Sequence, residues 1–271
     1  MSSDAASDER PRPILLVTGC SSGIGRCCAE GMRKRGWRVV ASARRAADVD
    51  ALRATGLETI QLDMACSESM REAVSCLANI TGGRLDAVFL NAGYGQSGAV
   101  ERLHRQSLRD QFETNVFGNV ELLTYLIPWM RAAGAGRIVF NSSVLGRVAI
   151  RDHGAYVASK HAVEAIADTL RLELYGSRIH VSLIEPGPIE SRFQANAAVM
   201  RARVEQDARP ARDRRYAFTL GPEAVLRKLA HACEAHAPQA RYPVTLPSHL
   251  IAILRRVLPT PWMDAILRSI A

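Results

Sequence analysis

Two side chains suited to moving a proton stand four residues apart. Tyr156 and Lys160 are the first and last residues of Tyr156-Val157-Ala158-Ser159-Lys160, and on a helix such positions lie on one face. A phenol has a pKa of about 10 and is a poor base at neutral pH, but a nearby ammonium favours the phenolate. The pair could therefore protonate a carbonyl oxygen or deprotonate an alcohol. The alternative is a half-buried tyrosine beside a lysine whose stem packs along apolar surface.

A glycine-rich segment near the N-terminus has the composition of a phosphate-binding turn. It follows an apolar run and precedes a helical pattern. Glycines permit the tight turn and let backbone N–H groups and the helix N-terminus approach a pyrophosphate. The spacing is GxxxGxG instead of the commoner GxGxxG, and a turn without a ligand is the alternative. The residues that we expect to bind a cofactor here are Gly19, Ser21, Ser22, Gly23, Ile24 and Gly25.

The residues after the second apolar run bear on the choice of cofactor. An acidic residue at that place would bind the ribose 2′-hydroxyl of NAD, but this chain has Ala43-Arg44-Arg45. Guanidinium groups match the geometry of a phosphate. Arg44 and Arg45 therefore predict a 2′-phosphate, and hence NADP(H). In a chain with 35 basic residues, ordinary surface charges are the alternative.

These residues need elements to position them, and the hydropathy pattern predicts alternating strands and helices. Apolar runs that are nearly continuous indicate strands buried on both faces of a parallel sheet. The predicted strands are Ile14–Thr18, Arg38–Ser42, Thr59–Leu62, Ala87–Asn91, Arg137–Ser142, His180–Glu185 and Arg241–Leu246. The predicted helices are Gly23–Arg35, Ser67–Asn79, Ser107–Met130, Gly154–Tyr175 and Pro222–Ala235. This alternation is typical of a doubly wound α/β sheet, a Rossmann fold of about seven strands with helices on both faces.

The pattern runs without a linker, so we predict one catalytic domain over residues 13–247. Residues 1–12 are polar, lack the apolar core of a signal peptide and predict a disordered lead. Residues 187–220 are too long for a routine connection and are a candidate substrate lid. Residues 248–271 predict an amphipathic C-terminal extension of two short helices, broken by Pro259 and Pro261.

Composition excludes several classes of protein. Of the 271 residues, 48% are hydrophobic and 23% are charged, which excludes wholesale disorder. No apolar stretch has the length of a membrane span. The six cysteines lack metal-ligand spacing and no secretion signal precedes them, so we expect free thiols, no metal site and a cytoplasmic protein. The net charge of +8 raises nucleic-acid binding as an alternative, but no nucleic-acid-binding signature accompanies it and we expect none.

Taken together, these motifs resemble the short-chain dehydrogenase/reductase superfamily in its compact form, from Ile14 to about Leu246. Further matching motifs are Leu62-Asp63, Asn91-Ala92-Gly93, Thr114-Asn115-Val116, Asn141-Ser142-Ser143 and Pro186-Gly187-Pro188-Ile189. The cofactor residues that the resemblance implies are Asp63 at the adenine, Asn91, Ala92 and Gly93 along the cleft, Pro186, Gly187 and Ile189 beside the nicotinamide, and Tyr156 and Lys160.

The resemblance also implies a catalytic tetrad of Ser143, Tyr156, Lys160 and Asn115. Ser143 is preferred to Ser142 because it lies thirteen residues before Tyr156, the usual distance in the family. In the implied reaction NADPH delivers hydride to a carbonyl carbon, Ser143 stabilises the charge on the oxygen, and Tyr156 supplies the proton. Lys160 lowers the pKa of Tyr156 and holds the nicotinamide ribose, while Asn115 supports a water relay.

The predicted substrate residues are mostly apolar with a few polar groups, as in most small-molecule pockets. They are Tyr94, Ser97, Val144, Leu145, Ile150, His153, Ile189 and Phe193. His153 is either a substrate contact or a surface histidine. Three segments, Ile184–Ile189, Phe218–Val225 and Arg241–Leu246, look like those of bacterial NADP-dependent aldehyde reductases, which are similar in turn to retinol and 17β-hydroxysteroid dehydrogenases. The resemblance implies reduction of hydrophobic aldehydes. Hydroxysteroid or retinol turnover is the alternative, and a catalytically silent NADP(H)-binding regulator is an alternative of another class.

The resemblance further implies a homodimer or homotetramer built through residues 107–130 and 154–175. The extension over residues 248–271 has regularly spaced apolar residues with Arg255, Arg256 and Arg268 among them. Such helices usually cover a core, so we expect packing over the substrate cleft or against another subunit. Attachment to an anionic membrane surface is the alternative.

Overall fold

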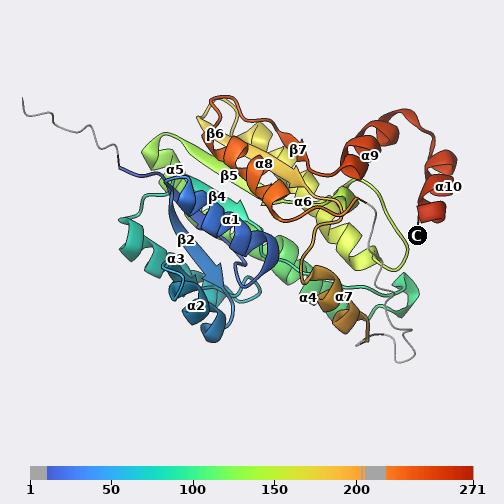
Figure 1. Ribbon diagram of the computed structural model, residues 1–271, viewed down its shortest axis with the longest axis horizontal. Helices are drawn as coiled ribbons and strands as arrows, with labels where there is room; N and C mark the ends of the chain where they lie inside the picture. The colour runs from blue at the N-terminus through green and yellow to red at the C-terminus, as the bar shows by residue number, and fades with distance from the viewer. Residues whose placement is uncertain (1–10, 203, 205–217, 271) are drawn as a thin grey trace, which may run out of the picture.

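The strands form one parallel sheet in the order β3-β2-β1-β4-β5-β6-β7 (Figure 1). The computed structural model describes residues 11–202, 204 and 218–270. The strands are β1 (Ile14–Val17), β2 (Arg38–Ala43), β3 (Glu58–Gln61), β4 (Ala87–Leu90), β5 (Gly136–Asn141), β6 (Ile179–Glu185) and β7 (Arg241–Pro243). All seven predicted strands are present, and β7 is shorter than its apolar run. The order reverses between β1 and β4, so the predicted doubly wound Rossmann fold is confirmed.

Helices cover both faces of this sheet, which is why the central strands are apolar at every position. The helices on one face are α1 (Gly23–Lys34), α2 (Ala46–Arg53) and α8 (Glu223–Glu234). Those on the other are α3 (Ser67–Thr81), α4 (Arg105–Phe112), α5 (Gly118–Ala133) and α6 (Gly154–Glu173). Each face buries its own apolar cluster, the arrangement expected when a parallel sheet is covered on both sides.

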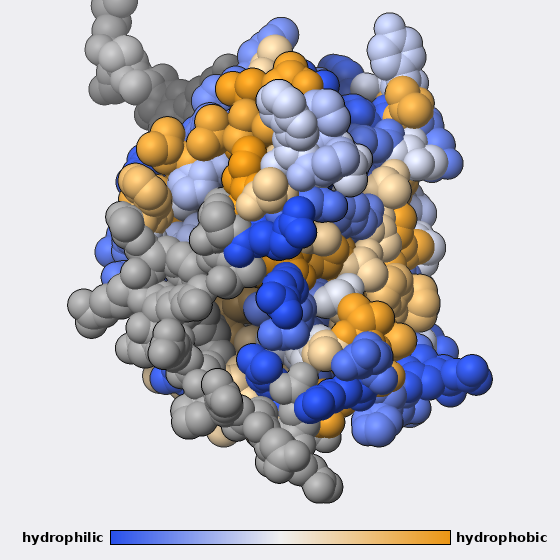
Figure 2. Space-filling view, turned by 90° about the vertical axis from the view of Figure 1, so that its right-hand side faces the viewer, coloured by the Kyte–Doolittle hydropathy of each residue, from blue (hydrophilic) through white to orange (hydrophobic). Residues whose placement is uncertain are grey.

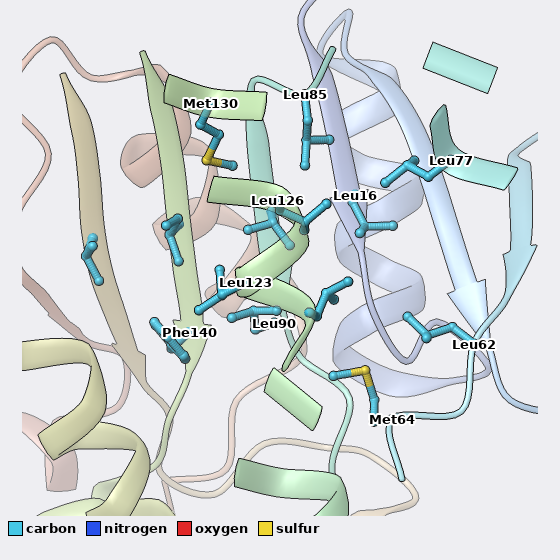
Figure 3. Close-up of a cluster of buried hydrophobic side chains, with 14 of the residues drawn as sticks. Leu16, Leu62, Met64, Leu77, Leu85, Leu90, Leu123, Leu126, Met130 and Phe140 are labelled. Atoms are coloured by element: carbon cyan, nitrogen blue, oxygen red, sulfur yellow. The ribbon is translucent and has the colours of Figure 1, made fainter. Parts of the chain in front are cut away.

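The cluster under α5 fixes that helix on the sheet. Leu123 and Leu126 of α5 point toward Leu16 of β1, Leu90 of β4 and Phe140 of β5 (Figure 3). Each of these side chains is almost fully buried, and such burial stabilises by roughly 1.5–3 kcal/mol per side chain. The start of α5 is therefore held in place, and so is the turn that precedes it.

The helix predicted over Ser107–Met130 is not continuous. A π-helical turn over Glu113–Phe117 separates α4 from α5. Such turns are rare and often lie at functional sites. Asn115 lies in this turn and is buried, and the Asn119 side chain donates a hydrogen bond of 2.7 Å to the Asn115 carbonyl oxygen. The periodicity of the sequence does not reveal the interruption, because apolar spacing continues through it.

Three helices lie beyond the carboxyl ends of the strands, at the right of Figure 1. α7 (Phe193–Ala202) occupies part of the predicted lid, while residues 203 and 205–217 of that lid lie outside the described residues. Residues 1–10 of the predicted lead do so too. α9 (Leu246–Val257) and α10 (Thr260–Ile270) form the C-terminal extension. Pro259 separates them, but Pro261 lies within the first turn of α10, where proline is tolerated.

Candidate active site

The carboxyl ends of the central strands bring the predicted site residues to one edge of the sheet. The glycine-rich turn follows β1, Asn91 follows β4, Ser143 comes two residues after β5, and Pro186 follows β6. In a doubly wound sheet, ligands bind outside the carboxyl ends at the point where the strand order reverses. That point lies between β1 and β4, beside the glycine-rich turn.

The glycine-rich turn has the geometry of an anion site. Gly19 has a φ of +71°, and a Cβ there would lie 2.7 Å from the Ala92 Cα, so only glycine fits without strain. Ser22 precedes α1 and has an extended backbone. Among the described residues, its side chain makes no capping hydrogen bond to the first N–H groups of α1. A helix N-terminus with free N–H groups favours a phosphate. These residues fit a dinucleotide pyrophosphate.

A set of hydrogen bonds holds the turn against β4 and β5. The Asn91 side chain donates to the carbonyl oxygens of Thr18 (2.9 Å) and Gly19 (3.2 Å). The Thr18 hydroxyl oxygen accepts from the backbone N–H groups of Asn91 and Ala92, both at 2.9 Å. The Asn141 side chain donates to Asn91 Oδ1 at 2.9 Å. The floor of the cleft is thus fixed by Asn91 and Thr18.

The other predicted cofactor residues lie along the same edge. Asp63, half-buried after β3, accepts a hydrogen bond from the Ala65 N–H at 3.0 Å. Gly93 is exposed, and Ile189 packs against the core under α1. Gly187 has no room for a side chain, because a Cβ would overlap the Thr245 hydroxyl. The Pro-Gly turn therefore lies directly against the start of α9.

The two arginines after β2 differ in their surroundings. Both are exposed, but the Arg45 guanidinium binds Asp48 through two hydrogen bonds of 2.7 and 3.0 Å. Asp48 has a lowered pKa, chiefly because of this bond, and the charges of Arg192 and Arg44 lower it further. Arg192, which the sequence did not single out, thus joins Arg44 and Arg45 around one carboxylate. Three guanidinium groups against one carboxylate leave a local excess of positive charge.

The four residues of the predicted tetrad are all buried. The Lys160 ammonium donates to the Asn141 carbonyl oxygen at 2.6 Å and lies 5.7 Å from the centre of the Tyr156 ring. Ser143 Oγ accepts from the Leu145 N–H at 3.1 Å, so its own hydrogen is free to be donated elsewhere. Ser143, Tyr156 and Lys160, which the sequence predicts as one site, therefore lie close together in the structure.

Asn115 joins the tetrad to the loop after β4. Its side chain donates to the Tyr94 carbonyl oxygen (3.0 Å) and to Ser159 Oγ (3.2 Å), while its Oδ1 accepts from the Tyr94 N–H (3.1 Å). The Ser159 hydroxyl donates to the Tyr156 carbonyl oxygen at 2.7 Å. Asn115 therefore positions both the cleft loop and the helix that carries Tyr156.

Burial governs the ionisation of the central pair. It raises the pKa of Tyr156 to about 12, with a hydrogen bond from Ser143 acting in the opposite direction. It lowers the pKa of Lys160 to about 8, opposed by the charge of Glu164. The resemblance implies that Lys160 lowers the pKa of Tyr156, whereas in this structure burial raises that pKa and Ser143 is the group that lowers it. Tyr156 is thus held as a proton donor.

Apart from Ile189, the predicted substrate residues fall into two groups. Phe193 begins α7, and its ring centre lies 5.1 Å from that of Tyr156 at a tilt of 57°. Val144 and Leu145 lie in the 3-10 turn η3 (Val144–Gly146), directly after Ser143. These three predicted residues are therefore placed beside the tetrad by local connection or direct contact.

The other group lies on the loops after β4 and before α6. Ser97 is buried, whereas Tyr94, Ile150 and His153 are half-buried. A His153 ring nitrogen lies 2.9 Å from the Arg151 carbonyl oxygen, a local contact that suits the structural alternative for this histidine. Gln96 was not foreseen, yet its side chain donates to the carbonyl oxygens of Ser97 (2.8 Å) and Met200 (3.0 Å), tying this loop to α7.

A buried network of charges behind the tetrad was also missed. The Ser142 hydroxyl donates to Glu164, which lies one helical turn after Lys160. Arg241 binds Glu164 at 3.1 Å and Glu185 at 3.2 Å, and Arg147 binds Glu185 at 2.7 Å. Burial raises the pKa of Glu164, and the charge of Glu185 adds to that effect. The network joins the strand ends that carry Ser143 and the Pro-Gly turn.

Comparison with known proteins identifies the family. A model described as short chain dehydrogenase matches residues 13–202. The chain belongs to the short-chain dehydrogenase family. It is 41% identical over 257 residues to an uncharacterized oxidoreductase of Escherichia coli (strain K12), YbbO, with 94% of each protein covered.

Two further relatives of this short-chain dehydrogenase bear on its chemistry. Retinol dehydrogenase 8 of Homo sapiens is 34% identical over 194 residues, which cover 68% of this chain and 61% of that protein. An actinorhodin polyketide ketoreductase solved with NADPH superposes with a TM-score of 0.74 at 28% identity, covering 86% of this chain and 95% of that one. The protein is therefore an oxidoreductase of a family that binds a nicotinamide cofactor.

Proposed function

We propose that the protein is an NADPH-dependent carbonyl reductase for hydrophobic aldehydes and, in the reverse direction, an alcohol dehydrogenase. The observation that carries this is the buried Tyr156 phenol, whose pKa of about 12 keeps it protonated beside the Ser143 hydroxyl. A proton donor and a hydrogen-bond donor that meet at one point suit a carbonyl oxygen that gains charge. The apolar Phe193 ring against Tyr156 suits a hydrophobic substrate.

The chain's own residues account for the remaining steps. The nicotinamide, when bound, supplies the hydride. Tyr156 gives its proton to the substrate oxygen, and Ser143 donates a hydrogen bond to the same atom. Lys160 uses one N–H on the Asn141 carbonyl, and its other two remain for the ribose hydroxyls of the cofactor. Asn115 positions Tyr156 through Ser159 and supports a water relay that returns the proton.

The preference for NADP(H) rests on the charges after β2. The charges of Arg44 and Arg192 both lower the pKa of Asp48, whose carboxylate is already paired with Arg45. A 2′-phosphate placed there would meet unsatisfied positive charge, and hydrogen bonds to charged groups are worth about 1.5–3 kcal/mol. Arg44→Ala should therefore lower the ratio of kcat/KM for NADPH over NADH by at least about tenfold. Arg53→Ala, at an exposed pair with Asp50, is the control, and a wild-type preference for NADH would contradict the assignment.

The experiment that tests the reaction compares Tyr156→Phe with wild type on a panel of aliphatic and aromatic aldehydes. We expect kcat to fall about 10²–10⁴-fold, while the Kd for NADPH, read from its fluorescence, changes little. Unchanged turnover in Tyr156→Phe would contradict the proton-donor role. A wild-type protein that binds NADPH but reduces no carbonyl would instead favour the silent regulator.

A second substrate class has an observation of its own in the similarity to retinol dehydrogenase 8. Retinoids and hydroxysteroids are hydrophobic and would also suit the Phe193 side of the cleft. Retinal and ketosteroids therefore belong in the same panel. A kcat/KM for either that exceeds the aldehyde values would make it the preferred substrate class.

We further propose a cytoplasmic homodimer or homotetramer without a nucleic-acid partner. Exposed apolar side chains in the segments expected at the subunit contact support the oligomer, namely Phe117 in the π turn, Val120 in α5, Leu172 in α6 and Tyr175 just after it. Light scattering after gel filtration measures the assembly, and a monomer would contradict it. Tight binding in a gel shift at physiological salt would contradict the absence of a nucleic-acid partner.

A further inference from the structure

The C-terminal helix α9 turns its apolar side away from the protein. Leu246, Leu250, Ile253 and Val257 are 65%, 54%, 62% and 67% exposed. Their spacing of four, three and four residues places them on one stripe of the helix. Ser248, on the opposite side of the helix, is buried. Ile251 and Leu254 of the same helix are half-buried. A surface helix normally buries its apolar residues, so the fully exposed stripe is an additional apolar surface.

Polar contacts fix α9 in this orientation. The hydroxyl oxygens of Thr245 and Ser248 lie 2.9 Å apart, and both crowd the position where Gly187 would carry a Cβ. α9 also packs on η3, which follows Ser143. The inner side of the helix therefore belongs to the Pro-Gly turn and the tetrad loop. The stripe cannot turn inward without breaking these contacts.

The next helix extends the same exposed surface. Met263 is buried and holds α10 in place, while Trp262 is 66% exposed. Figure 2 shows hydrophobic side chains gathered across the upper part of this side of the molecule, where α9 and α10 lie. Tryptophan is enriched where a protein meets a membrane surface, because its ring is apolar and its N–H is polar.

The charge of this segment is positive. Residues 246–271 contain three arginines, Arg255, Arg256 and Arg268, and one acidic residue, Asp264. The three arginines are exposed. At about 100° per residue, Arg256 lies roughly a quarter turn from the middle of the stripe. Arg255 lies about half a turn from the stripe, so Arg256 is the arginine of α9 that flanks it. Apolar residues on one side, an arginine at the flank and a tryptophan nearby are the features of a helix that lies in a membrane interface.

We propose that the outer face of α9 and α10 docks on the surface of an anionic lipid bilayer. Among the described residues no helix could cross a membrane, so the contact is peripheral. Anionic headgroups complement the arginines of this segment, whereas a second copy of the same face would carry charge of the same sign. If the proposed function holds, a hydrophobic carbonyl dissolved in the bilayer would enter close to η3 and the tetrad.

The test uses the full-length protein in vesicle flotation, which needs no enzymatic activity. Vesicles of phosphatidylcholine alone are compared with vesicles that also contain phosphatidylglycerol, each at low and high salt. We expect binding to the phosphatidylglycerol vesicles that weakens with salt. Leu250→Glu should reduce the bound fraction at least about tenfold. Val100→Glu, the same kind of change at an apolar residue that is 71% exposed on the loop after β4, lies outside the expected subunit contacts; it is the control and should bind like wild type.

Reversing the charge with Arg255→Glu and Arg256→Glu together should abolish the preference for phosphatidylglycerol. Circular dichroism and thermal unfolding establish that each variant is folded. Failure of wild type to float with either vesicle would overturn the proposal, as would equal losses in Leu250→Glu and Val100→Glu. A change of oligomeric state in Leu250→Glu, with no vesicle binding by wild type, would assign the face to contact between copies and equally overturn it.

Discussion

Replacing Lys160 by methionine should change how stability depends on pH, in a direction set by burial. Burial lowers the pKa of Lys160 from 10.5 to about 8, against the opposing charge of Glu164. The unfolded chain therefore holds a proton at Lys160 more tightly than the folded chain does. The free energy of unfolding consequently rises with pH between about 8 and 10.5, and this rise is absent from a chain without Lys160.

The size of the effect follows from the two pKa values. Each factor of ten in proton affinity corresponds to 1.36 kcal/mol, so charged Lys160 costs the folded state roughly 3 kcal/mol at pH 8 and about 1 kcal/mol at pH 10. Between pH 8 and pH 10, the free energy of unfolding of wild type should therefore rise by about 2 kcal/mol relative to that of Lys160→Met. Methionine cannot titrate, and its other effects on packing are constant with pH. The raised pKa of Tyr156 acts only above pH 10 and is present in both proteins.

Urea unfolding followed by tryptophan fluorescence at pH 7, 8, 9 and 10 measures this difference. Lys34→Met, at the exposed C-terminal end of α1, is the matched control, and its difference from wild type should stay constant across the series. A difference between wild type and Lys160→Met that is also constant would refute the reasoning, because it would mean that folding does not change the proton affinity of Lys160.

Three other substitutions test the cleft and its support. Lys160→Arg should lower kcat at least about 10²-fold, because a planar guanidinium differs from an ammonium in shape and donor geometry; steady-state rates near wild type would contradict this. Gly187→Ala should destabilise by about 1–3 kcal/mol, since its Cβ overlaps the Thr245 hydroxyl; an unchanged Tm would show that the contact gives way. Glu164→Ala should cost about 1–3 kcal/mol because the buried Ser142 hydroxyl loses its acceptor; urea titration measures the loss, and an unchanged midpoint would contradict it.

The features that the sequence predicts well are those whose geometry is local. The i,i+4 relation of Tyr156 and Lys160 survives folding because a helix preserves it, and the turn around Gly19 follows from backbone geometry that few residues permit. Near-continuous apolar runs predicted the sheet because strands covered on both faces have no polar side. In these cases a few neighbouring residues contain the whole physical cause.

The features that the sequence did not predict depend on partners far apart in the chain. Glu164 and Arg241 meet across 77 residues, and the charge of Arg192 lowers the pKa of Asp48, which is far from it in the sequence. Neither pairing leaves a periodic signal. The high pKa of Tyr156 escaped for a similar reason, because the sequence shows the charge four residues away but not how completely the ring loses water.

The π turn between α4 and α5 contains one residue more than the same turn of a continuous α-helix would. Deleting one residue from Glu113–Phe117 would let α4 run into α5 as a continuous α-helix and would remove the wide turn that contains Asn115. Buried Leu122 and Leu126 would keep α5 on the sheet, so the change would fall on Asn115 and Gln111, which hold the cleft loop. The number of residues in this segment is therefore constrained separately from their identities, and a change of length would be tolerated less well here than substitution at its exposed positions.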